Sequence, residues 1–327
     1  MELNLLDSKI LYELSINSRQ TDSQIGKKVG KSQQVINYRI KQLIEREIIT
    51  EFFTVIHFLA FGLSNYIIMV KLKNLNEKEK EKIIKELYQK KEILSVSECG
   101  GKWDLIVNTI SKNSVNFQKE FSKLLEEYSD QIVNYDLFIS MGGSSFGRKY
   151  IYQKKNERKT ISFGEEKIVS PSATELKILQ ALSKNARKNI IQIASETGIN
   201  YKTIIRKIKK LKTEGVITGF RPFINLSKIG YLPSKIYLDL NKMTKKEETD
   251  FIEFLSSKKN AIGILKMVGK FNFSITIETA TQEEMWQFYK EIQNYLKEKI
   301  RSIEIIPIFK KHEYKFFPEI LLANQQH

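Results

Sequence analysis

The sequence predicts an α+β protein in which one two-part unit occurs twice along the chain. Shifting the 327-residue sequence by 168 places aligns residues 21–50 with residues 189–218 without a gap. In each copy, helical spacing of apolar residues gives way to β-branched and aromatic runs. The same offset still aligns residues 101–104 with residues 269–272. A register held for so long indicates duplication of a complete unit, with a period too long for a solenoid.

The first fifty residues are expected to form three helices. The first lies near residues 6–15, with Asp7 near its N-terminus. Gly30 suits a left-handed turn after the second helix, and Ser32 is a good N-cap for the third. The third helix has an apolar stripe comprising Ile36, Ile40, Leu43 and Ile44. Its opposite side is polar, as in a helix that reads a DNA groove, whereas the plainer alternative is a helical hairpin with a solvated face.

The recognition helix of copy two is more basic than that of copy one. It carries Lys202, Arg206, Lys207, Lys209, Lys210 and Lys212. Such cationic density suits contacts with DNA phosphates, whereas the amides of copy one can pair with adenine edges. Copy one could therefore specify the base sequence while copy two anchors the protein on the DNA backbone. The predicted DNA contacts are Ser32, Gln33, Gln34, Asn37, Tyr38, Lys41, Tyr201, Lys202, Arg206, Lys209 and Lys210.

The second part of each unit reads as β-α-β-β-α-β, which is the ferredoxin-like order. In copy one the expected strands are residues 65–73, 93–99, 103–110 and 133–139, with helices at 76–90 and 117–128. We therefore predict two winged-type helix-turn-helix domains and two ferredoxin-like domains in tandem. Their predicted bounds are 1–63, 64–141, 172–231 and 232–327, with a linker at 142–171. Loss of periodicity in that linker leaves room for one short strand near Tyr150.

Composition indicates a soluble protein with an anionic partner. Lys and Arg number 54 against 38 acidic residues, giving a net charge of +16. The lone Cys99 excludes an intramolecular disulfide, and three scattered histidines form no zinc-type cluster. Because no catalytic, metal or phosphate-loop constellation occurs, we expect no enzyme activity, metal or cofactor. The absence of a signal peptide or a long apolar run favours the cytoplasm and no membrane partner.

The pattern LDSKIL…NSRQTDSQIGKKVGKSQQVINYRIKQLIEREII, then a connector, a glycine and a G-x-aromatic-D turn, resembles the Lrp/AsnC (feast/famine) transcription regulators. The likeness covers nearly the whole chain, twice. It implies an N-terminal helix-turn-helix that binds double-stranded DNA, and a C-terminal domain that pairs with its neighbour and binds a small effector, such as an amino acid. The chain departs from the family pattern at Gly26, Glu47 and Asn200.

The same resemblance implies effector-binding residues at the glycine turns. These are Gly101, Trp103 and Asp104 in copy one, and Gly269 and Asn272 in copy two. Asn272 has no charge where copy one has Asp104, which favours one effector class per chain over two equivalent sites.

Three further expectations concern alternatives and assembly. Siroheme decarboxylases resemble the same architecture, but they would need histidine or arginine chemistry, and only His57 lies near the corresponding region. A sensing module that has lost DNA binding is the other alternative. With both heads in one chain, we expect an intramolecular pseudo-dimer whose sheets meet face to face, while higher homo-oligomers stay open.

Overall fold

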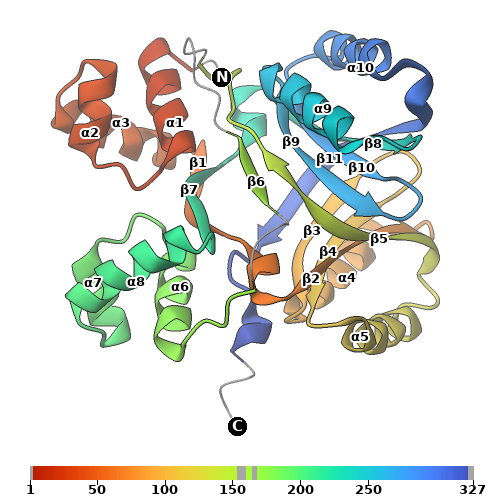
Figure 1. Ribbon diagram of the computed structural model, residues 1–327, viewed down its shortest axis with the longest axis horizontal. Coiled ribbons are helices and arrows are strands. Elements are labelled where there is room, and N and C mark those ends of the chain that lie inside the picture. The colour runs from red at the N-terminus through yellow and green to blue at the C-terminus, as the bar shows by residue number, and fades with distance from the viewer. Residues whose placement is uncertain (1–2, 153–159, 164–167, 323–327) are drawn as a thin grey trace.

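The computed structural model describes residues 3–152, 160–163 and 168–322. Figure 1 shows two layers, with the helix-turn-helix heads on one side and the sheets on the other. The head of copy one comprises α1 (Leu5–Ile16), α2 (Asp22–Val29) and α3 (Gln33–Glu45), followed by β1 (Ile49–Ile56). The head of copy two comprises α6 (Ala173–Lys184), α7 (Ile190–Thr197) and α8 (Tyr201–Thr213), followed by β7 (Ile217–Ile224). The three predicted helices of each head are confirmed.

Local capping fixes where the helices of the first head begin and end. Thr21 and Gln24 form a capping box at the start of α2, and Gly30 ends α2 at φ +70°. The Ser32 hydroxyl then accepts the Val35 N–H at the start of α3. Each such cap contributes about 1 kcal/mol, so the turn is held by local chemistry.

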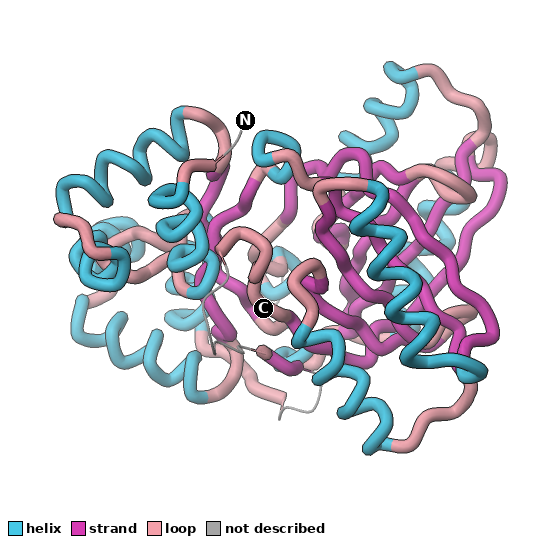
Figure 2. Tube along the Cα trace, turned by 90° about the horizontal axis from the view of Figure 1, so that it is seen from above, coloured by secondary structure: helices cyan, strands magenta, loops and turns pink. Residues whose placement is uncertain are grey.

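The sheet layer has the predicted ferredoxin-like order in both copies. Copy one contains β2 (Ser64–Leu72), α4 (Glu77–Gln89), β3 (Ile93–Cys99), β4 (Leu105–Ser111), α5 (Ser114–Glu127) and β5 (Ile132–Ser145). Copy two contains β8 (Leu232–Leu240), α9 (Lys245–Ser257), β9 (Ala261–Val268), β10 (Phe273–Thr279), α10 (Gln282–Leu296) and β11 (Ile300–Tyr314). Short 3₁₀ turns at Phe58–Phe61 and Leu226–Ile229 join the heads to these domains. Figure 2 shows the helices outside the strands.

The two sheets are joined at their edges as well as facing one another. The strand order β2-β4-β3-β11-β8-β10-β9-β5 closes on itself because β2 also pairs with β5. The long strands β5 and β11 make the crossings, pairing with β9 and β3 of the other copy. Edge pairing satisfies backbone groups that open sheets would leave exposed. The sequence predicted the facing sheets but not this closure.

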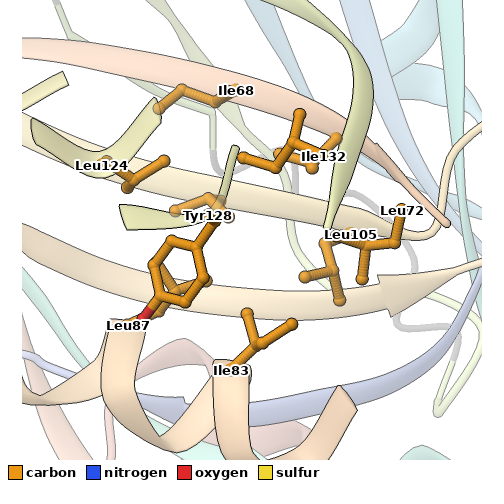
Figure 3. Close-up of a pocket in the computed structure, with 10 residues that line it drawn as sticks. Ile68, Leu72, Ile83, Leu87, Leu105, Leu124, Tyr128 and Ile132 are labelled. Atoms are coloured by element: carbon orange, nitrogen blue, oxygen red, sulfur yellow. The ribbon is translucent and has the colours of Figure 1, made fainter. Parts of the chain in front are cut away.

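Different apolar residues fill the space between the sheets and the space under the helices. Between the sheets lie Ile67, Met69, Cys99, Trp103, Ile106, Phe138, Tyr237, Met267, Phe271, Ile306 and Ile308, which we call the inner core. Val96, Leu105 and Val107 instead pack beneath the helices α4 and α5. Figure 3 shows that helix-side core around a void of about 10 Å³. A void of that size barely admits one water, so it is a packing defect and not a ligand site.

The predicted linker is more ordered than expected. Strand β5 continues to Ser145, past the predicted boundary at residue 141. Phe146, immediately after it, is buried. The short strand of this segment is β6 (Ile161–Phe163), which pairs with β5, and Tyr150 lies in a turn. The prediction of a strand near Tyr150 is therefore wrong. Tyr150 makes side-chain contacts with Glu278 and Tyr231 and takes part in no strand pairing.

The heads are joined by a two-stranded sheet to which each head contributes one strand. Strand β1 of copy one pairs antiparallel with β7 of copy two. A single apolar core runs through both heads, including Leu11 and Ile36 of one head and Leu179 and Ile204 of the other. Each recognition helix is consequently placed relative to the other by shared packing.

Candidate nucleic-acid interface

The predicted reading face of copy one is exposed and continuous. Gln33, Gln34, Asn37, Tyr38 and Lys41 together line one shallow depression on the surface of α3. Their side chains are exposed, while the apolar positions of the same helix other than Ile44 and Val35 face the core. The structure thus gathers five predicted contacts on one surface. Ile44, predicted to be buried with the stripe, is 42% exposed and does not belong to it.

The reading face of copy two lies at positions offset by 168 from that of copy one. Tyr201, Lys202, Arg206 and Lys209 are exposed on α8. The fifth position is Ile205, which is 51% exposed and aligns with Asn37. Our sequence reasoning missed Ile205, although the repeat register already contained the signal. An apolar side chain on a reading face can contact the methyl group of thymine.

Lys210 differs from the other predicted contacts. Its Nζ lies 3.0 Å from Glu175 Oε1, and Lys207 Nζ lies at the same distance. Glu175 belongs to α6 and is only 1% exposed. Lys210 is therefore better explained as a partner of Glu175 than as a phosphate contact.

In both copies an acidic residue of the first helix forms ion pairs with basic residues in or just after the recognition helix. In copy one the equivalent residue is Asp7, which is buried and lies 3.7 Å from Arg39 and 3.4 Å from Arg46. In copy two burial opposes ionisation of Glu175, yet hydrogen bonds from Ser172 and from two lysines lower its pKa to about 2. These ion pairs join the first helix of each head to its recognition helix or to the residue that ends it.

Replacing Glu175 by Gln is expected to lower the free energy of unfolding by about 2 kcal/mol at neutral pH. Because the folded pKa of Glu175 lies below its ordinary value of 4.5, this contribution is present above about pH 4.5 and is lost as the pH falls toward 2. Urea unfolding at several pH values measures it. The control is Lys209→Ala on the exposed face, and equal stability of wild type and Glu175→Gln at pH 7 would contradict the prediction.

Two arginines at equivalent positions link the heads. Arg19 Nη1 donates to the Ala186 carbonyl at 2.5 Å. Arg187 Nη1 donates to the Ser18 carbonyl at 2.7 Å, and its Nη2 lies 2.7 Å from Asp22 Oδ1. Guanidinium groups with several acceptors in fixed directions are geometrically demanding. The two heads are thus held as one unit by hydrogen bonds in both directions.

The acidic and amide residues of the glycine turns brace the neighbouring strand. Asp104 Oδ2 accepts the Leu72 N–H at 2.8 Å. Asn272 does the same in copy two, where its Oδ1 accepts the Leu240 N–H at 3.0 Å. Both residues therefore have a structural role that needs no ligand, and their effector role stays a prediction.

The other predicted turn residues differ in accessibility. Trp103 is fully buried in the inner core. Gly101 and Gly269 are exposed and have φ values of +84° and +151°, a region that favours glycine. A side chain at Gly269 would also meet the Phe138 ring at 2.6 Å. At these turns an effector could reach backbone groups more readily than the Trp103 ring.

The remaining candidate groups, His57 and Cys99, are both buried. His57 is buried where β1 ends, and its backbone N–H donates to the Val216 carbonyl. Burial raises the pKa of the Cys99 thiol to about 12, which keeps it protonated. In the described ranges, no group of three or more His, Cys, Asp or Glu residues is placed to hold a metal ion. The described helices also include none with the length and apolar content needed to cross a bilayer.

Two exposed recognition helices, fixed to one another above a ring of ferredoxin-like sheets, define a DNA-binding regulator. Residues 3–50 and 171–218 match the family model for winged helix-turn-helix DNA-binding domains. The HTH-type transcriptional regulator Ptr1 of Methanocaldococcus jannaschii is 32% identical over 112 residues, which are 30% of this chain and 76% of Ptr1. The chain belongs to the Lrp/AsnC family of transcription regulators.

Other similar proteins add a family relative and a likeness of fold. The leucine-responsive regulatory protein of Rhizobium meliloti is 35% identical over 63 residues, which are 19% of this chain and 40% of that protein. The crystal structure of the siroheme decarboxylase NirDL superposes with a TM-score of 0.62 at 11% identity, covering 98% of this chain and all of the other. At that identity the superposition shows a shared fold alone.

Proposed function

We propose that this chain regulates transcription in the cytoplasm by binding double-stranded DNA in response to a small effector, an amino acid or a related metabolite. The observation that carries the proposal is the pair of exposed reading faces held together by β1, β7 and the two linking arginines. Copy one offers amide and hydroxyl groups to base edges, and copy two offers cations to phosphates. The chain catalyses no reaction in this proposal.

The proposal also assigns the pairing of the two halves within one chain. Both ladders that join the sheets, β5 with β9 and β11 with β3, connect copy one to copy two. A single chain then presents two unlike heads, so its operator should be an imperfect palindrome or two unlike half-sites about 34 Å apart. Larger assemblies of the chain are compatible with this arrangement.

Mapping the genomic fragments that the chain retains, with and without each free amino acid, tests the function directly. We expect selective retention of promoter fragments and a change in affinity with one class of amino acid. If the chain retains no genomic fragment better than random DNA under any condition, it does not bind DNA selectively. Only binding of a small effector would then remain of the proposal.

Calorimetric titration with that amino acid is expected to show one binding event per chain, which Asp104→Asn weakens. Asn272 accepts the equivalent backbone N–H in copy two, so the substitution keeps that hydrogen bond while it removes the charge that pairs with Lys71. Asn272→Asp is the matched reverse variant. Two equal sites that survive Asp104→Asn would contradict a single charged effector site.

A siroheme-decarboxylase-like enzyme is the second candidate, since the two proteins share a fold over nearly the whole chain. Incubation of the chain with siroheme, followed by mass spectrometry, distinguishes the two. We expect no loss of carbon dioxide from siroheme, and turnover would replace the regulatory proposal.

A further inference from the structure

Four basic side chains from different elements lie close enough for their charges to interact, Arg148 with Arg221 and Lys311, and Lys311 with Lys235. Arg148 follows β5, Arg221 lies on β7, Lys235 on β8 and Lys311 on β11. We call these four residues the cationic cluster. Lys235 stands two residues before Tyr237 of the inner core, so both lie on the inner face of the sheet. None of these residues belongs to a reading face or a glycine turn.

One carboxylate accounts for only one of these charges. Arg148 Nε and Nη2 lie 2.8 and 3.0 Å from the two oxygens of Glu278, which also accepts the Tyr150 hydroxyl. Burial opposes ionisation of Glu278, but Arg148 lowers its pKa and keeps it charged. The two parallel hydrogen bonds make Arg148 and Glu278 an electrically neutral ion pair.

No ion pair joins the other three cations to a carboxylate among the described residues, although Lys235 faces Thr276, two residues before Glu278 on β10, and the charge of Glu278 also acts on Lys311. Lys235 Nζ donates to the neutral Thr276 hydroxyl at 2.7 Å. Burial lowers its pKa to about 7, helped by the charge of Lys311. Burial likewise lowers the pKa of Arg221 to about 10, with Arg148 adding to the effect. Such mutual repulsion costs free energy that an anion would offset.

Comparison of the two copies shows that the fold does not require these charges. At the positions offset by 168, Arg221 aligns with Phe53 and Lys235 with Ile67. Glu278 aligns with Ile110, and Arg148 with Phe316. Two of these counterparts, Phe53 and Phe316, stack with ring centroids 4.1 Å apart. The same place in the fold is thus apolar on one side and cationic on the other.

Water reaches the cationic cluster despite the protein around it. Lys311 has an exposed side chain, and Arg221 and Lys235 are half-buried. Residues that are surrounded by protein yet solvent-accessible can exchange water for a small ion. Guanidinium and ammonium groups together are the donors that carboxylates and phosphates prefer.

We propose that Arg221, Lys235 and Lys311 bind a small-molecule anion that carries carboxylate or phosphate groups, with the Arg148–Glu278 pair as the fixed wall of the site. The site occurs once per chain, because copy one has apolar residues at the equivalent positions. The inference concerns ligand binding alone and holds whether or not the anion alters DNA binding.

Thermal unfolding of the full chain tests the site, with inorganic phosphate and succinate as probes at constant ionic strength. We expect at least one probe at millimolar concentration to raise the Tm of the wild type by about 2 °C or more. The probe with the larger shift identifies the preferred group. Lys235→Ile introduces the residue that copy one carries, so it should fold and should lose the shift.

Lys119→Ala is the matched control, because it removes one exposed lysine of α5, away from the cationic cluster and the reading faces, and should keep the full shift. If Lys235→Ile fails to fold, Lys311→Gln replaces it, since Lys311 is exposed and its loss leaves no buried void. The proposal is overturned if neither probe shifts the wild type, or if the folded cluster variant shifts as much as the wild type.

Discussion

Alanine at both Arg206 and Lys209 is expected to lower the affinity for duplex DNA by roughly tenfold and to reduce the salt slope by about 2. The slope is that of log affinity against log salt concentration, and each phosphate contact contributes about one unit. Both side chains are exposed on α8 and align with Tyr38 and Lys41 of the other reading face. Fluorescence anisotropy of a labelled duplex over a range of salt concentrations measures the change.

Lys210→Ala provides the control, because it removes the same charge from the next position of the helix. Lys210 pairs with Glu175, so the loss of the Lys210 side chain should reduce the stability of the chain. The salt slope should fall by less than about half a unit. A double variant that folds normally and keeps the wild-type slope would exclude α8 as a phosphate anchor. A Lys210 variant with the larger loss of slope would reverse our assignment of that residue.

The reading faces could be predicted from sequence because their determinants are local. Caps such as Ser32 and the period of the apolar residues fix which side of α3 faces the core. The repeat register then transfers that face to α8. Ile44 lies at the edge of the apolar stripe, one residue after the buried Leu43, and the helical turn between them carries Ile44 out to solvent.

The closure of the sheets could not be predicted from sequence. Alternation within β5 gives its faces, but not that its last residues leave their own sheet to pair with β9. That choice depends on where the edge of the other copy lies, which is a tertiary property. The same reason explains why the start of the predicted linker is ordered.

The sequence carries a signal for the cationic cluster. Alignment of the copies places Lys235 opposite Ile67 and Arg221 opposite Phe53. A charge that replaces an apolar residue within an otherwise preserved repeat is informative, because the fold tolerates the apolar version. What the sequence could not show is that residues from β7, β8 and β11 come together.

Cutting the chain at a protease site inserted at Lys155, which lies outside the described residues, is expected to leave the two halves associated at micromolar concentration. Three ladders connect the copies, namely β1 with β7, β5 with β9, and β11 with β3. The inner core also draws its side chains from both copies. Gel filtration of the cut chain under native conditions, with SDS gels of the peak, measures the association.

Phe138→Ala in the cut chain is expected to weaken this association by about 3–5 kcal/mol, more than a hundredfold in Kd. Phe138 is fully buried in the inner core, and its ring centroid lies 6.2 Å from that of Tyr237 and 6.0 Å from that of Phe271, both of the other copy. Phe121→Ala is the matched comparison, because Phe121 lies on α5 and packs against the helix-side core of copy one alone. It should destabilise its own half without a comparable loss of pairing. Halves of the unsubstituted chain that separate at micromolar concentration, while each stays folded, would show that like copies pair between chains instead.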